Sequence, residues 1–124
     1  TNDVKRYFSV SAEHIGQGVE RLIQAVRVSE SGPDDGTPKI LLVAPVPLAP
    51  MDQDMEPHFA PEADSISKSE KLAEVYQHTV EPLEVPFLDA GGVVNRPGSD
   101  GVHLDGEGHA ILGKAISQKV KSLL

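Results

Sequence analysis

The sequence contains no cysteine, which excludes disulfide bridges, thiolate zinc sites and a cysteine nucleophile. It also lacks any apolar run long enough to span a bilayer. Basic residues are few: 11 Lys and Arg stand against 19 Asp and Glu, so the net charge is −8. This charge repels phosphate backbones and anionic lipid surfaces, so we expect binding to neither nucleic acid nor membranes. The absence of cysteine favours the reducing cytoplasm as the compartment.

The chain of 124 residues suffices for one small domain and is too short for two. It begins Thr1-Asn2-Asp3 without an initiator methionine, so we expect the true N-terminus to lie elsewhere. Hydrophobic patterning predicts three helices, over residues 11–28, 65–81 and 106–123. It predicts two buried strands between them, over residues 39–44 and 85–90. Ser11 and Asp105 are the expected N-caps of the first and last helices. Pro45 to Asp64 holds five prolines and predicts a long functional loop.

Helices that alternate with buried strands favour an open parallel sheet covered on both faces, which is a three-layer α/β/α, flavodoxin-like fold. Two parallel strands, however, cannot cover three amphipathic helices or satisfy their own outer edges. We therefore expect residues 1–124 to be the C-terminal part of a single domain. An N-terminal segment absent from this chain is the expected partner that completes the sheet.

The clearest chemical signal is Asp100-Gly101-Val102-His103, in the loop between the second strand and the last helix. A carboxylate that accepts from Nδ1 of an imidazole fixes the tautomer in which Nε2 can take a proton. Active sites of open α/β sheets form in the loops after the strands, which is where this motif lies. The spacing alone also fits a turn aspartate followed by a solvated histidine, because Asp-x-x-His is a short pattern.

Three stretches make the chain resemble the SGNH (GDSL) hydrolases, and in particular their arylesterase and acyltransferase branch. Asp100 to Gly113 (DGVHLDGEGHAILG) is similar to the Asp-x-x-His motif and the helix that follows it. Thr1-Asn2-Asp3 is similar to the end of the Gly-x-Asn-Asp motif, and Ile40 to Met51 (ILLVAPVPLAPM) to a strand and proline-rich loop of that branch. The resemblance extends over the whole chain.

The resemblance implies a role for each matching residue. His103 would be the general base toward a serine hydroxyl, Asp100 would orient His103, and Asn2 would donate to the oxyanion. The implied reaction is hydrolysis of a short-chain carboxylic ester through an acyl-serine intermediate, with no cofactor. The family also implies acyl transfer to alcohols and assembly into homo-oligomers. Which small ester is the substrate stays open.

The Gly-Asp-Ser nucleophile motif of the family is absent, and so is its glycine oxyanion donor. No serine lies between a strand and a helix as the nucleophile must. Five serines are instead predicted to be loop, cap or helix residues: Ser9, Ser11, Ser65, Ser67 and Ser69. Both missing elements would precede Thr1, in agreement with the unfinished sheet. Four further residues are weaker candidates for contact with the substrate: Tyr7, Phe8, Met55 and Phe59.

Three alternatives remain at this point. Thr1 could be an N-terminal nucleophile of an amidohydrolase, although such enzymes use antiparallel sheets. His103, Asp105 and His109 could ligate zinc, but Asp105 is the expected helix cap and we predict no metal site. The chain could also be a non-catalytic binding module, if the preceding segment supplies no nucleophile.

Overall fold

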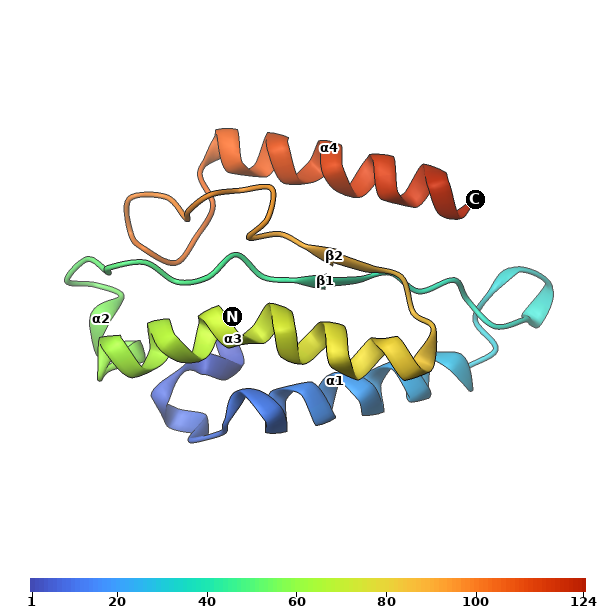
Figure 1. Cartoon of the computed structure of the whole chain (residues 1–124), viewed down its shortest axis with the longest axis horizontal. Coiled ribbons are helices and arrows are strands. Elements are labelled where there is room, and N and C mark those ends of the chain that lie inside the picture. The colour runs from blue at the N-terminus through green and yellow to red at the C-terminus, as the bar shows by residue number, and fades with distance from the viewer.

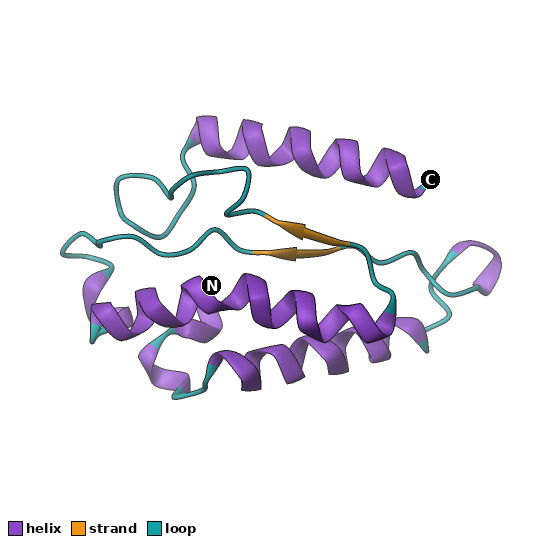
Figure 2. Ribbon diagram, in the orientation of Figure 1, coloured by secondary structure: helices purple, strands orange, loops and turns teal.

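The computed structural model describes all residues, from Thr1 to Leu124. Four α-helices surround two short strands: α1 (Ala12–Arg27), β1 (Leu42–Ala44), α2 (Glu56–Phe59), α3 (Glu62–Val80), β2 (Phe87–Asp89) and α4 (Gly106–Leu123). The strands pair in parallel, with Leu42 opposite Phe87 and Ala44 opposite Asp89. Figure 1 shows α3 and α1 on one side of the strands and α4 on the other, and Figure 2 shows how short the strands are beside the helices. The expected α/β architecture with a parallel sheet is confirmed.

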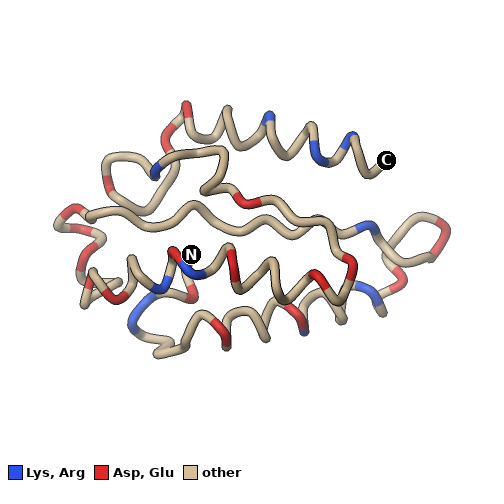
Figure 3. The backbone as a smooth tube through the Cα atoms, in the orientation of Figure 1, with Lys and Arg blue, Asp and Glu red and all other residues tan.

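Local capping fixes both predicted helix starts. The Ser11 hydroxyl accepts a hydrogen bond from the His14 amide, and an Asp105 carboxylate oxygen accepts from the Gly108 amide at 2.7 Å. These bonds satisfy backbone donors that the first helical turn leaves without partners. In α4, Glu107 lies in the first turn and Lys121 in the last, as the helix dipole favours (Figure 3).

Several boundaries differ from the sequence prediction. The expected loop 45–64 contains the short helix α2, and α3 begins at Glu62 instead of residue 65. The first turn of α3 is polar, so the apolar period on which the prediction rested begins too late to reveal it. The strand expected over 39–44 is reduced to Leu42–Ala44, since only these residues pair with β2.

The main core lies between α1, α3 and the strand layer, around the fully buried Val4, Phe59 and Leu72. Helices α1 and α3 approach closely: a Cβ on Gly16 would lie 2.6 Å from Val75. A smaller cluster around Val46, Ala90 and Val94 packs on the side of α4.

Much apolar surface stays exposed. Leu22 on α1 is 67% exposed and Ile111 on α4 is 42% exposed, and the two-stranded sheet has an unpaired edge on each side. A free-standing domain normally covers such stripes and edges. The structure thus shows what the sequence predicts, that two strands are too few to cover the apolar faces of the helices. None of its helices combines the length and the apolarity that crossing a membrane requires.

Candidate active site

The Asp100–His103 turn is built by its own hydrogen bonds. One Asp100 oxygen, Oδ1, accepts from the backbone amides of Val102 and His103 at 2.9 and 2.8 Å. The other oxygen, Oδ2, lies 2.6 Å from Nδ1 of His103. These interactions join residues two and three positions apart, so a stretch of four residues holds the carboxylate against the imidazole. The structure brings together the two residues that the sequence singled out.

The electrostatics of the pair follow from these bonds. The hydrogen bond from the His103 side chain, with those from the Val102 and His103 amides, lowers the pKa of Asp100 from 3.8 to about 2. Asp100 is therefore a carboxylate at neutral pH and accepts from Nδ1–H. The His103 side chain is 69% exposed, and its Nε2 makes no hydrogen bond within residues 1–124. The ring thus presents its second nitrogen to whatever group approaches from outside the chain.

A second loop supports the turn from behind, and the sequence did not predict this contact. The Ala49 amide donates to the Gly101 carbonyl at 2.9 Å, and the Asp52 amide donates to the Asp100 carbonyl at 3.4 Å. Gly101 has φ +76°, and a Cβ there would lie 2.4 Å from the Pro50 carbonyl oxygen. Only glycine fits both this backbone conformation and this close approach. A glycine directly after the turn aspartate was the signal that could have revealed it.

Helix α3 holds this supporting loop in place. The buried Ser69 hydroxyl accepts from the Leu48 amide at 2.9 Å, and Glu62 Oε1 accepts from the Met51 amide at 2.5 Å. Ser69 also donates to the Ile66 carbonyl, so its hydroxyl is satisfied twice. A buried hydroxyl that both accepts and donates in this way serves the loop structure.

The two ends of the chain meet at one groove, because the neighbours of Asn2 and His103 line it together. Thr1 and Val102 both line an apolar groove of about 320 Å³. The other lining residues come from β1, α3, α4 and the loops after the two strands: Val43, Ala44, Pro45, Val46, Tyr76, Ala90, Leu104 and Leu112. Asn2 opens a 3-10 turn that the fully buried Val4 anchors, and its exposed side-chain amide makes no hydrogen bond within the chain. The groove runs beside β1.

The four weaker candidates are distributed differently. Tyr7 and Phe8 are 58% and 55% exposed, and the Tyr7 hydroxyl forms a 2.7 Å hydrogen bond with Nδ1 of His58. Met55 is half-buried at the start of α2. Phe59 is wholly buried in the core, with no surface left for a substrate, so its expected place at the substrate entrance is wrong. Its ring belongs to the main core cluster, together with Val4 and Leu72.

The rival sites receive no support from the geometry. No group of three His, Cys, Asp or Glu side chains comes together as a metal-binding cluster. Asp105 caps α4, and His109 is exposed on that helix. The strands are parallel, unlike the antiparallel sheets expected for a nucleophilic Thr1.

Helices on both sides of a parallel sheet, with an Asp–His pair in the loop after a strand, agree with the architecture expected from the resemblance to SGNH-type hydrolases. Solved structures agree. The chain is 35% identical to a carbohydrate acetylesterase from Sinorhizobium meliloti, with a TM-score of 0.88, and 35% identical to the M. smegmatis aryl esterase, with a TM-score of 0.89. A second carbohydrate acetylesterase family member from Sinorhizobium meliloti is 30% identical, with a TM-score of 0.86.

Each of these alignments covers 98% of this chain and 57% of the other, so the chain spans little more than half the length of the proteins it matches. No family model and no curated protein sequence matches the chain. The resemblance to the SGNH-type hydrolases inferred from the motifs of the chain is confirmed by these structures.

Proposed function

We propose that these residues form the acid–base part of a serine ester hydrolase whose nucleophilic serine lies in a segment preceding Thr1. The observation that carries the proposal is the 2.6 Å contact between Asp100 Oδ2 and His103 Nδ1, beside a groove that Thr1 and Val102 share. Similarity to structures named as acetylesterase and aryl esterase supports the same reaction class. We refer below to these residues joined to that segment as the completed protein.

The unpaired edge of β1 supports the position of the missing segment. The apolar groove is lined by β1 and by Thr1 itself, so a chain that continues backward from Thr1 starts at this groove. A parallel strand there would satisfy the free edge and cover the exposed apolar stripe of α4. The loop at the carboxyl end of that strand would then bring a serine toward His103.

The proposed reaction has two stages, formation of an acyl-serine and its hydrolysis. Nε2 of His103 takes the proton of the serine hydroxyl while the serine oxygen attacks the ester carbonyl carbon, and Asp100 stabilises the imidazolium. The side-chain amide of Asn2 donates to the oxyanion. The tetrahedral intermediate collapses as His103 returns the proton to the leaving alcohol, which leaves an acyl-serine. Water, activated by the same imidazole, releases the acid and restores the serine. No cofactor takes part in either half. Where an alcohol replaces water, the same steps give acyl transfer.

The test is turnover of para-nitrophenyl acetate by the completed protein. His103→Ala should lower kcat about a thousandfold or more, since the attacking hydroxyl loses its base. His109→Ala is the matched control, because His109 is exposed on α4 and takes no part in the site. Activity in His103→Ala equal to that of the control would remove His103 from its proposed role.

Asn2 is tested separately. Asn2→Ala should lower kcat about a hundredfold or more, the usual cost of losing one oxyanion donor. The exposed Asn95 provides the control variant Asn95→Ala. A change in KM without a change in kcat would place Asn2 in ground-state binding instead of transition-state stabilisation.

The family resemblance also leads us to propose a homo-oligomer assembled through loop insertions. Sedimentation of the completed protein tests this directly. A monomer at micromolar concentration would overturn it.

A further inference from the structure

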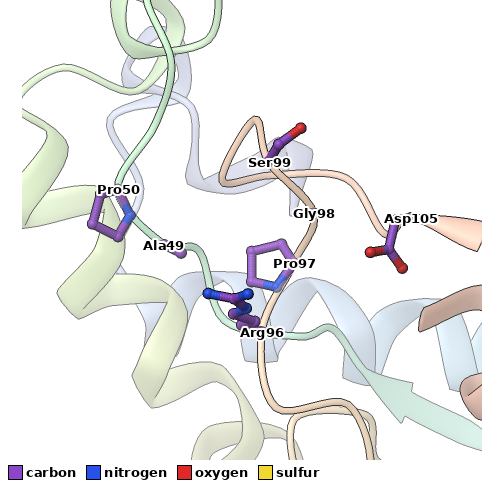
Figure 4. A pocket seen from close by; sticks show the side chains of 7 residues that line it. All are labelled: Ala49, Pro50, Arg96, Pro97, Gly98, Ser99 and Asp105. Carbon is purple, nitrogen blue, oxygen red and sulfur yellow. The ribbon is translucent and has the colours of Figure 1, made fainter. Parts of the chain in front are cut away.

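A polar pocket of about 500 Å³ flanks the Asp100–His103 turn and takes no part in the chemistry described so far. Its walls come from two loops that each follow a strand, through Ala49, Pro50, Arg96, Pro97, Gly98, Ser99 and Asp105 (Figure 4). Ser99 directly precedes Asp100, and the Gly98 amide donates to the His103 carbonyl at 2.6 Å. The pocket is thus attached to the backbone that positions the proposed base.

Three polar side chains in this pocket keep unused hydrogen-bonding capacity. The Arg96 guanidinium makes no hydrogen bond and no ion pair within residues 1–124, where the one ion pair joins Asp100 and His103. The Ser99 hydroxyl is exposed and has no partner in the chain. Asp105 uses Oδ1 to cap α4, which leaves Oδ2 free to accept. The pocket therefore offers the N–H donors of the Arg96 guanidinium, the Ser99 hydroxyl and one Asp105 carboxylate oxygen.

The backbone around Arg96 is held firmly. Val94 and Pro97, on either side of it, are buried, and Val94 belongs to the cluster beneath α4. Arg96 is also the only Lys or Arg between β2 and α4. Because the backbone is anchored, binding a ligand restricts mainly the Arg96 side chain.

The lining indicates the chemistry of the ligand. Apart from Ala49 and two proline rings it is polar and contains no aromatic side chain, so an aryl group would find little to contact. An anion would meet the Asp105 carboxylate and a chain of net charge −8. A neutral polyol fits better, because each hydroxyl both donates and accepts.

The position indicates which half of the ester binds there. In the proposed mechanism His103 returns its proton to the leaving alcohol, so the alcohol oxygen must lie near the ring. The pocket adjoins the His103 turn and is therefore the candidate site for the alcohol portion of the ester. We propose that this pocket is a subsite for the alcohol and that Arg96 selects polyhydroxylated alcohols such as sugars. The inference rests on the proposed esterase function.

The experiment measures selectivity between two acetyl esters in the completed protein. The probes are para-nitrophenyl acetate and mono-acetylated methyl glucoside, which share the acyl group and differ in the alcohol. Arg96→Met should lower the ratio of kcat/KM for the sugar ester to that for the nitrophenyl ester about tenfold, the usual effect of losing a charged hydrogen bond. Ser99→Ala should lower it about fivefold. Arg21→Met, at an exposed arginine on α1 outside the pocket, should leave the ratio unchanged.

Each outcome decides between the proposals. A ratio within twofold of the wild-type value in both Arg96→Met and Ser99→Ala overturns the subsite while the esterase stands. Wild-type protein that hydrolyses the nitrophenyl ester but not the sugar ester also overturns the subsite alone. If wild-type protein hydrolyses neither ester, the proposed function fails and the subsite fails with it. Should Arg96→Met not fold, the Ser99→Ala ratio decides.

Discussion

Replacement of Asp100 by asparagine separates the two tasks of this side chain. Oδ1 holds the turn through the Val102 and His103 amides, whereas Oδ2 faces Nδ1 of His103 at 2.6 Å. An asparagine keeps an oxygen for the two amides and places an NH₂ group opposite Nδ1. That group donates, so Nδ1 must accept and Nε2 must carry the ring proton. The imidazole then has the wrong tautomer for a base.

The expected magnitudes follow from this exchange. In the completed protein, Asp100→Asn should lower kcat for para-nitrophenyl acetate about a thousandfold to ten-thousandfold and change KM little. The turn bonds remain, so the free energy of unfolding should change by less than about 1 kcal/mol. Asp100→Ala removes both turn bonds as well and should cost about 2 kcal/mol more in stability.

The assay is steady-state kinetics together with urea unfolding of both variants. Asp100→Asn that keeps kcat within tenfold of wild type would refute the tautomer argument. Equal stability of Asp100→Asn and Asp100→Ala would refute the assignment of Oδ1 to the turn and Oδ2 to the His103 ring.

The same carboxylate makes stability depend on acid. Its pKa falls from 3.8 to about 2 on folding because the folded chain donates three hydrogen bonds to the charged form. A lowered pKa means that the contribution is complete above the unfolded value and is lost as the pH falls through the folded value. The stability difference between wild type and Asp100→Asn should therefore shrink between about pH 4 and about pH 2. A constant difference across that window would contradict the assigned hydrogen bonds.

Three further predictions concern the scaffold. Gly101→Ala should destabilise the completed protein by about 2 kcal/mol and lower kcat. The new Cβ would collide with the Pro50 carbonyl oxygen, and the φ of +76° is unfavourable for alanine. Gly113→Ala, on α4 with nothing within 4 Å, is the control, and urea unfolding should show it to be neutral or slightly stabilising. Ser69→Ala should cost about 1–3 kcal/mol, since the buried Leu48 amide loses its acceptor, and Ser69→Thr should recover part of it if the hydroxyl still fits. Residues 1–124 alone should unfold without a cooperative transition and bind a hydrophobic dye, and a sharp two-state melt would contradict this.

Local chemistry explains why parts of the structure could be predicted. Ser11 and Asp105 cap their helices through bonds three residues away. Such contacts need no information from the rest of the chain. The start of α3 was missed because its first turn is polar. Glu62 in that turn serves the distant Met51 amide, and no helical period reports such a contact.

Phe59 shows the opposite case. An aromatic residue in a proline-rich segment is equally consistent with an exposed rim and with a core position. Only packing against α3 and the N-terminal turns decides that it is buried. Burial depends on contacts distant in sequence, which a pattern of neighbours does not contain.

The sequence by itself determined the Asp100–His103 pair, because a four-residue turn with a glycine in it closes through its own hydrogen bonds. It also determined the class of fold, through the alternation of apolar strands and amphipathic helices. Only the tertiary structure placed Thr1 beside Val102 and Arg96 beside Asp105, around two cavities. Cavities arise where loops from separate strands end at one edge of a sheet, and that meeting depends on how helices pack across the whole chain.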